Sequence, residues 1–328
     1  MKRRTFLMGI GTAVMWPRAV GAMQADRARK IGVLLNFRQD DPEGQAQFSG
    51  FTQTLQKLGW TEDTNLHTEV RWPGNDADLY RKYAQELVAI EPEVILAAAT
   101  PSVAALQRLT RSIPIVFANV VDPVGAGFVA SMAHPGGNTT GFTAFEYSIS
   151  GKWLELLKEF VPALGRAVVV REPSVASGIG QFAAIQAFAS SSDLELTAID
   201  PHEENAIDPA FAALARQPNG GVIVTASSSV VAHRDLLIAA AMRYRLPAVY
   251  PFPYYTPPGG LASYGPDPVD AHSRAATYVD RILRGERPAN LPVQAPTNYQ
   301  LSINLKTAKS LGIAVPQALL ARADKVIE

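Results

Sequence analysis

The sequence predicts an α/β protein built from two doubly wound parallel-sheet lobes that three crossing segments join. Three observations carry this prediction. Buried strand-like runs alternate with helix-like runs through residues 30–120, and the same alternation restarts near residue 150. A hydroxyl-rich turn follows a buried strand in each half, as Thr100-Pro101-Ser102 and as Ser227-Ser228-Ser229. A chain of 328 residues also suits two compact lobes better than one core.

The first lobe opens with the apolar run KIGVLLN, which has the length and composition of a buried parallel strand. Apolar residues at helical spacing follow it, and Gly59 marks the end of that helix. Continuing in this way, we expect strands at 30–36, 66–72, 93–99 and 114–120, and helices at 43–58, 77–90, 101–109 and 125–132.

The second half repeats this order of elements. The segments IPIVF and LPAVY occupy equivalent places in the two halves, which favours two lobes of like design, although alanine-rich strand–helix units also look alike by chance. We expect helices at 152–160, 179–190, 209–215 and 230–244, and strands at 166–172, 194–199, 221–226 and 247–252.

The stretch AHPGGNTTGFT places turn residues directly before a strand-like run. We interpret residues 138–145 as a hinge strand between the lobes; the alternative is an ordinary edge strand. Further crossings are expected at 260–265 and 298–305, with helix 269–283 returning to the first lobe. The predicted domains are therefore a signal peptide at 1–22, lobe one at 29–142 plus 265–297, and lobe two at 143–264 plus 298–328.

The N-terminal sequence has the pattern of an export signal. A basic start is followed by an apolar run that is too short to span a membrane and by a small-residue end at Ala22. Arg3-Arg4-Thr5-Phe6-Leu7 is typical of the twin-arginine route. A general secretory signal with a chance arginine pair, or an uncleaved anchor, are the alternatives. We therefore expect a periplasmic protein.

The composition excludes several classes of function. Lys+Arg and Asp+Glu both number 30, so no basic excess suggests a nucleic-acid partner. The chain has 0 cysteines, which excludes disulfides, thiol chemistry and a lipidated N-terminus. The histidines lack metal-ligand spacing, and no convergent acid–base pair or nucleophile motif is evident. We expect no metal, no cofactor and no enzymatic activity.

A ligand is expected beyond the carboxyl ends of the strands, at the point where strand order reverses. For the order 2-1-3-4, the loops there carry Asn36-Phe37 and Thr100-Pro101-Ser102 in lobe one, and Arg171-Glu172 and the serine run in lobe two. Both hydroxyl clusters open helices, whose free N–H groups favour a carboxylate or another anion. The alternative is that they are ordinary helix N-caps.

Aromatic residues also gather at the expected strand ends, where they would pack on the body of a solute, although most aromatic side chains belong to cores. The complete set of expected ligand-binding residues is Asn36, Phe37, Thr100, Pro101, Ser102, Asn119, Asp122, Phe142, Thr143, Glu172, Ser227, Ser228, Ser229, Tyr250 and Tyr264.

Several segments, among them AHPGGNTTGFT, LASYGPD and NYQLSINLKTAKSLGI, resemble the ABC-transporter substrate-binding proteins of the tryptophan/tyrosine-binding type. The resemblance covers essentially the whole chain after the signal. It implies a type I periplasmic binding protein that closes on a small solute and delivers it to a membrane permease and its ATPase. It further implies an amino acid or another small carboxylate-bearing compound, aromatic in one branch of the family, as the solute, and a monomeric receptor.

The chain departs from this family in one loop. Relatives commonly carry an Asn-Pro-rich loop after the first strand of lobe two, where this sequence has Arg171-Glu172-Pro173-Ser174. Because that loop faces the cleft, the usual ligand does not carry over automatically. Two other functions stay open from the sequence: an exported α/β enzyme acting on a small molecule, and a module that presents a ligand to a membrane kinase.

Overall fold

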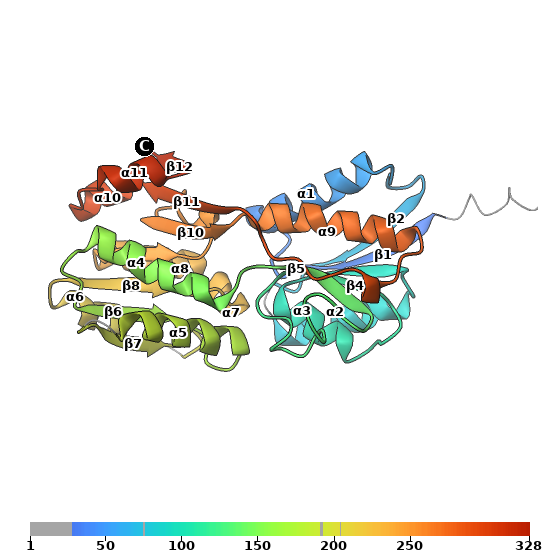
Figure 1. The fold of residues 1–328 in the computed structure, drawn as a ribbon, viewed down its shortest axis with the longest axis horizontal. Coiled ribbons are helices and arrows are strands. Elements are labelled where there is room, and N and C mark those ends of the chain that lie inside the picture. The colour runs from blue at the N-terminus through green and yellow to red at the C-terminus, as the bar shows by residue number, and fades with distance from the viewer. Residues whose placement is uncertain (1–27, 75, 191–192, 204) are drawn as a thin grey trace, which may run out of the picture.

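A computed structural model describes residues 28–328 except 75, 191–192 and 204. The described chain forms two α/β lobes that lie end to end along the long axis of the molecule (Figure 1). The expected signal peptide and its arginine pair lie outside the described residues. Among the described helices, none has the length and apolar character that crossing a membrane requires.

Lobe one is built on a five-stranded parallel sheet with the order β2-β1-β3-β4-β5. Helices α1 and α9 cover one face, and α2 and α3 cover the other (Figure 1). The elements are β1 (Arg29–Leu34), α1 (Pro42–Lys57), β2 (Leu66–Arg71), α2 (Ala77–Ala89), β3 (Val94–Ala98), α3 (Ala99–Gln107), β4 (Ile115–Val120), β5 (Thr139–Thr143) and α9 (Pro268–Leu283).

Lobe two is built on a seven-stranded sheet with the order β12-β11-β10-β9-β8-β6-β7. Its strands are parallel except at the β10–β11 pair. The elements are α4 (Ser150–Phe160), β6 (Arg166–Val170), α5 (Ala176–Ala189), β7 (Glu195–Ile199), α6 (Ile207–Ala215), β8 (Gly220–Val224), α7 (Ser228–Ala232), α8 (Arg234–Arg243), β9 (Ala248–Tyr250), β10 (Ala262–Pro266), β11 (Tyr299–Asn304), α10 (Leu305–Leu311), α11 (Gln317–Arg322) and β12 (Lys325–Ile327). Three short 3₁₀ turns, η1 (Tyr147–Ile149), η2 (Pro253–Tyr255) and η3 (Pro288–Asn290), complete the described elements.

The predicted fold class is confirmed: two doubly wound lobes share the strand order 2-1-3-4. Local sequence explains where the long helices begin. Asp41 and Asp267 accept hydrogen bonds from the backbone at the first turns of α1 and α9, and each is followed by a proline, which suits the first helical position. The central strands are fully buried, as parallel strands covered on both faces must be.

The segment 138–145 is an ordinary edge strand for most of its length, the alternative stated above, and the chain passes between the lobes only at its end. Its strand, β5, is the edge strand of sheet one and pairs with β4 along its length. Gly141 allows this pairing: a Cβ there would lie 2.1 Å from the carbonyl oxygen of Phe117, and its φ of +152° is rarely open to other residues. The chain changes lobes immediately afterwards, since Phe142 packs in the core of lobe one whereas Ala144 and Phe145 pack in that of lobe two.

The other two expected crossings are also regular strands for most of their length. Residues 260–265 and 298–305 contain β10 and β11, which pair with each other antiparallel in sheet two. The chain leaves this sheet after Pro266, where α9 begins at Pro268 in lobe one. It returns after Gln294, whose backbone hydrogen-bonds to Gly141 and Thr143 of β5. Figure 1 shows the three connections side by side at the junction.

Two expected helices differ from the structure. Residues 125–132 form turns, because Gly127 has a φ of +73° and the carboxylate of Asp122 accepts from the N–H of Gly125, which holds a tight turn. The single helix expected at 230–244 is divided into α7 and α8 at His233. The imidazole Nδ1 of His233 lies 2.8 Å from the carbonyl oxygen of Ser229, inside the broken turn.

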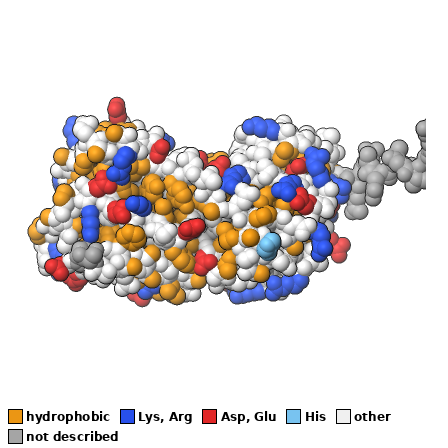
Figure 2. All heavy atoms as spheres, in the orientation of Figure 1, with side chains coloured by type: hydrophobic (Ala, Val, Ile, Leu, Met, Phe, Trp, Pro, Cys, Tyr) orange, Lys and Arg blue, Asp and Glu red, His pale blue; other side chains and the backbone are white. Residues whose placement is uncertain are grey.

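The surface carries both signs of charge. Acidic and basic side chains are interspersed on the face drawn in Figure 2, and hydrophobic side chains gather over lobe two, on the side where α4 and α5 lie. Ile179 and Phe188 of α5 are among the exposed hydrophobic residues. Phe188 also covers Gly151 of α4, where a Cβ would lie 2.2 Å from its ring.

A buried histidine lies where α9 meets the end of β4. His272 is fully buried, and its Nδ1 lies 2.9 Å from the carbonyl oxygen of Pro268 and 3.3 Å from the amide nitrogen of Asn119. Burial lowers the pKa of His272 to about 4, because the charged imidazolium cannot be hydrated there. The neutral ring is therefore part of the folded structure at pH 7.

We expect acid to destabilise the protein through His272. Because its pKa is lower in the folded than in the unfolded protein, the stabilisation is complete above about pH 6.5 and is lost as the pH falls towards 4. Between pH 7 and pH 5 the loss should be roughly 2 kcal/mol. Urea unfolding at pH 7 and pH 5 measures this loss of unfolding free energy in the wild type and in His272→Gln. The loss should be smaller in His272→Gln than in the wild type. A variant that replaces the exposed His134 should lose as much as the wild type. Equal pH dependence in all three proteins would contradict this assignment.

Candidate functional site

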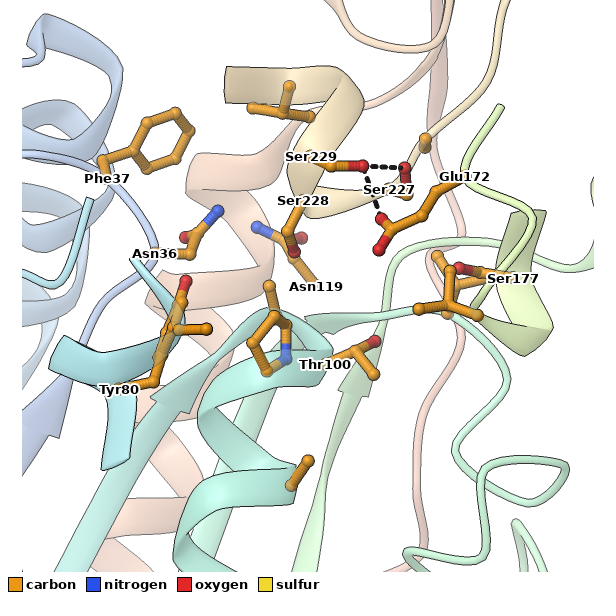
Figure 3. Close-up of a pocket in the computed structure, with 18 of the residues that line it drawn as sticks. Asn36, Phe37, Tyr80, Thr100, Asn119, Glu172, Ser177, Ser227, Ser228 and Ser229 are labelled. Carbon is orange, nitrogen blue, oxygen red and sulfur yellow. Dashed lines mark hydrogen bonds between the residues drawn. The ribbon is translucent and has the colours of Figure 1, made fainter. Parts of the chain in front are cut away.

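A cavity of about 390 Å³ lies between the two lobes (Figure 3). This volume falls within the range of about 300–1,000 Å³ that is usual for small-molecule sites. Both lobes contribute walls, and each wall is made of the loops that follow parallel strands. The expected residues that line it are Asn36, Phe37, Thr100, Pro101, Asn119, Glu172, Ser227, Ser228 and Ser229.

The parallel sheets explain why these residues meet. Asn36 follows β1, Thr100 follows β3, Glu172 follows β6 and Ser227 follows β8, so all four extend from carboxyl ends of strands at the two switch points. Asn119 comes from a register shift between β4 and β5 and has a φ of +58°. This irregularity turns its amide away from the strand alternation and towards the cavity, as bulges near functional sites commonly do.

The wall of lobe two contains a carboxylate held by serine hydroxyls. Glu172 Oε2 accepts a hydrogen bond of 2.5 Å from Ser229 Oγ, and Oε1 accepts one of 3.2 Å from Ser174 Oγ. Ser229 Oγ lies 3.3 Å from Ser227 Oγ, which extends the chain of hydroxyls along the wall (Figure 3). Only 15% of the Glu172 side chain is exposed. The arrangement presents a nearly buried carboxylate to the cavity.

The wall of lobe one contains neutral polar groups and two guanidinium groups. Helix α3 begins at Ala99, which has a φ of +62°, and no side chain caps its first N–H groups. Thr100 lies half-buried in this first turn and points into the cavity (Figure 3). Arg81 and Arg108 line the same side, and Arg81 pairs with Asp78. An uncapped helix start favours an anionic part of a ligand. The two guanidinium groups add positive charge to the same wall, Arg108 from the opposite end of α3.

Aromatic rings form the apolar part of the lining, with Phe37 and Tyr80 from lobe one and Phe252 and Tyr254 from lobe two. The rings of Phe252 and Tyr254 are stacked with their centroids 5.3 Å apart. Burial raises the pKa of the Tyr80 and Tyr254 phenols, so both stay neutral. These surfaces would contact an apolar or aromatic body of a ligand.

An ion pair connects the lobes next to this aromatic wall. The guanidinium of Arg234, at the start of α8, lies 3.2 Å from the carboxylate of Asp41, the N-cap of α1. It also lies over the ring of Tyr254, 5.5 Å from the centroid. Side-chain exposure is 13% for Arg234 and 21% for Asp41, so solvent screens this pair less than an ordinary surface pair. A second polar contact joins residues that follow β4 and β5, since Tyr147 Oη donates to Asp122 at 2.9 Å.

Three of the expected polar residues lie away from the cavity lining. Ser102 is fully buried, and its hydroxyl faces the carbonyl oxygen of Leu35 at 3.5 Å inside lobe one. The carboxylate of Asp122 is engaged by Tyr147 and by the turn at Gly125. Thr143 is buried at the end of β5. Helical geometry turns Ser102 inward and Thr143 ends a buried strand, whereas Asp122 is occupied within a turn; neighbours in sequence of Ser102 and Asp122 line the cavity.

The three aromatic residues that were expected to contact a solute beside Phe37 pack elsewhere. Phe142 packs on Tyr278 in the core of lobe one, with centroids 4.7 Å apart. Tyr250 is buried against Tyr255, and Tyr264 stacks on Tyr299. None of the three expected rings, Phe142, Tyr250 or Tyr264, is among the residues that line the cavity.

Sequence reasoning missed several residues of the lining. Tyr80 shares the apolar stripe of α2 with Ala84 and Leu87, so its spacing is that of a core residue. Arg81 and His202 gave no signal, because single charged residues in helices and turns are common on any surface. Their positions depend on how the two lobes face each other, which no local pattern records.

Among the described residues, one group of three possible metal ligands lies close enough to share an ion: Glu62, Asp63 and His67. It is exposed on lobe one and does not line the cavity. Both carboxylate oxygens of Glu62 already accept hydrogen bonds from Thr68. The geometry at the cavity instead suits reversible binding: hydroxyls, amides, one carboxylate and aromatic surfaces converge from two lobes.

Known proteins resemble the chain over most of its length. A curated tyrosine-binding protein of Clostridioides difficile (strain R20291) is 25% identical over 288 residues, which are 88% of this chain and 83% of that protein. A crystal structure of a conserved domain protein from Vibrio cholerae O1 biovar eltor superposes with a TM-score of 0.84 at 29% identity, covering 92% of this chain and 100% of the other. The ABC domain of Streptococcus pneumonia in complex with L-Trp gives 0.83 at 24% identity, with the same coverage.

The family model for ABC transporter substrate binding proteins matches residues 31–327, which include both sheets and every wall of the cavity. The two-lobed fold and the cavity between the lobes are what a protein that binds a small solute requires, and they agree with this match. The chain belongs to the family of ABC transporter substrate-binding proteins.

Proposed function

We propose that this protein is the extracytoplasmic receptor of an ABC importer and that it closes its lobes on an amino acid or another small carboxylate-bearing compound with an apolar or aromatic body. The observation that carries this proposal is the cavity of about 390 Å³ with walls from both lobes. The names of the relatives, a tyrosine-binding protein and a domain in complex with L-Trp, support the same class of solute.

Closure follows from the position of the cavity. A solute that contacts both walls does so only when the lobes are together, so its binding free energy favours the closed arrangement. The three connections at the junction would bend, because in the described part of the chain they are the covalent links between the lobes, whose strands and helices pack into different buried clusters.

Each wall has its own role in this proposal. Thr100 and the first N–H groups of α3 would hold a carboxylate, and Arg81 and Arg108 would add positive charge elsewhere on the same wall. The hydroxyls of Ser227 and Ser228 would complete polar contacts from lobe two. Phe37, Tyr80, Phe252 and Tyr254 would pack on the apolar body, a role that the sequence had suggested for Tyr250 and Tyr264.

We further propose that residues 1–22 direct the chain to the periplasm, by the twin-arginine route that Arg3-Arg4 favours. There the receptor would act as a monomer without enzymatic activity, without a nucleic-acid partner, and would deliver its solute to a permease in the inner membrane.

Solute binding should stabilise the chain that begins at residue 23. A ligand that binds only the folded state at 100 times its dissociation constant adds about 2.7 kcal/mol, a clear rise in the unfolding midpoint. We expect this rise with L-tryptophan, L-tyrosine or another apolar amino acid, measured by thermal unfolding against a panel that includes sugars and purines. A rise with sugars or purines alone would contradict the proposed class of solute.

Replacing Thr100 by alanine should weaken binding of the stabilising solute about tenfold, because a hydrogen bond to a charged group contributes roughly 1.5–3 kcal/mol. Calorimetric titration measures the change. Ser102→Ala is the matched control, since that hydroxyl faces Leu35 instead of the cavity, and its affinity should equal that of the wild type. Equal losses in both variants, or a loss only in the control, would contradict the role given to Thr100.

Breaking the ion pair between the lobes should disfavour closure. Asp41→Asn keeps a good N-cap for α1 but removes the charge that faces Arg234, and we expect a loss of affinity of about fivefold. Asp208→Asn is the control, because it breaks an exposed ion pair with Arg243 within lobe two. Calorimetric titration measures the affinity of each variant, and small-angle scattering of the ligand-bound protein measures its radius of gyration, which is larger when the lobes stay apart. Asp208→Asn should match the wild type in both. Unchanged affinity in Asp41→Asn would show that the pair contributes nothing to closure.

A further inference from the structure

Glu172 is the one aspartate or glutamate among the described residues that line the cavity. It stands in the loop after β6, held by Ser229 Oγ at 2.5 Å and Ser174 Oγ at 3.2 Å, and its carboxylate points towards the centre of the cavity (Figure 3). Backbone packing fixes the loop as well: a Cβ on Gly178 would lie 1.8 Å from the carbonyl oxygen of Glu172. The carboxylate is therefore held in place before any ligand arrives.

The charge of this carboxylate is poorly compensated by the protein. Among the ion pairs of the described residues, Glu172 has a single partner, His202; its Nε2 is 3.8 Å from Glu172 Oε1, and its side chain is half-exposed. The guanidinium groups that line the cavity, on Arg81 and Arg108, belong to the wall of lobe one. Arg171, its neighbour in sequence, lies over the ring of Phe182, 4.7 Å from the centroid.

Closure of the lobes makes this charge more costly. The side chain is already only 15% exposed, and a solute in the cavity displaces the water that remains around it. Serine hydroxyls stabilise a carboxylate but do not neutralise it. A ligand with only an anionic end would add a second negative charge to the same enclosed space, whereas a cationic group would form a charge-assisted hydrogen bond.

We infer that Glu172 selects the solute by accepting a hydrogen bond from its ammonium group, so that the protein binds α-amino acids and discriminates against the same compounds without the amino group. Glu172 and the serines behind it form the cationic end of the site, and the wall of lobe one, with Thr100 and the two arginines, forms the anionic end. The zwitterion thus spans the cleft. This inference rests on the proposed function and narrows its solute from carboxylates to amino acids.

The test compares ligand pairs that differ only in the amino group: L-tryptophan with indole-3-propionate, and L-leucine with 4-methylpentanoate. Each is titrated into the wild type, Glu172→Gln and the control Glu195→Gln, which removes a charge from an exposed position on β7 of the same lobe. The measured quantity is the ratio of the two affinities within one protein. A partly unfolded fraction cancels in that ratio, so a folding defect cannot imitate the effect.

We expect the wild type and Glu195→Gln to prefer the amino acid of at least one pair by tenfold or more, and Glu172→Gln to reduce that preference by about 10- to 100-fold. An unchanged ratio in Glu172→Gln would overturn the inference and leave the receptor function intact. Equal affinity of the wild type for the amino acid and the carboxylate in both pairs would also overturn the inference and leave the receptor function intact. A wild type that binds no member of the panel would overturn the proposed solute class, and this inference with it.

Discussion

The direction of the strands is the constraint on which the rest of this structure depends. Because both sheets are parallel through their central strands, the loops at the carboxyl ends of each sheet gather at one edge. The three connections bring these two edges face to face, and the cavity between them is lined by loops of the same topological kind. Binding residues can therefore vary in the loops while the two buried cores stay unchanged.

The chemistry of the two walls is asymmetric, although the lobes share one strand order. The hydroxyl-rich turns after β3 and β8 occupy equivalent positions, yet the wall of the first also contains two arginines and the wall of the second contains Glu172. In lobe two the serines hold a carboxylate instead of standing free for an anion. Glu172 thus gives the wall of lobe two a negative charge, opposite in sign to the arginines of lobe one, and makes the cavity bipolar.

The lobes meet at the junction through two kinds of contact: hydrogen bonds that hold the three connections, and side-chain contacts directly between the lobes. The backbone of Gln294 hydrogen-bonds to β5, and Tyr147 donates to Asp122, so the connections are tied to both lobes near their crossing points. Beyond these connections, the lobes also meet through the Asp41–Arg234 ion pair and the contact of α3 with α7. The ion pair and the α3–α7 contact can form and break as a solute enters and leaves, because none of Asp41, Arg234 and the residues of α3 and α7 joins a buried cluster shared by both helices.

The sequence by itself determined the order of strands and helices, the two-lobed α/β class and the loops at the switch points, because hydrophobic period and turn residues act locally. Those loops do supply Asn36, Thr100, Glu172 and Ser227 to the cavity. Only the tertiary structure decided which neighbouring side chains face it. Ser102 turns into the core two positions after Thr100, Tyr250 is covered by Tyr255, and Tyr80 reaches the cavity from an apolar stripe. Successive helical residues point about 100° apart, so the direction of a side chain depends on where its helix begins. Which side chains reach the cavity also depends on how the two lobes are oriented towards each other, and no short sequence pattern specifies that orientation.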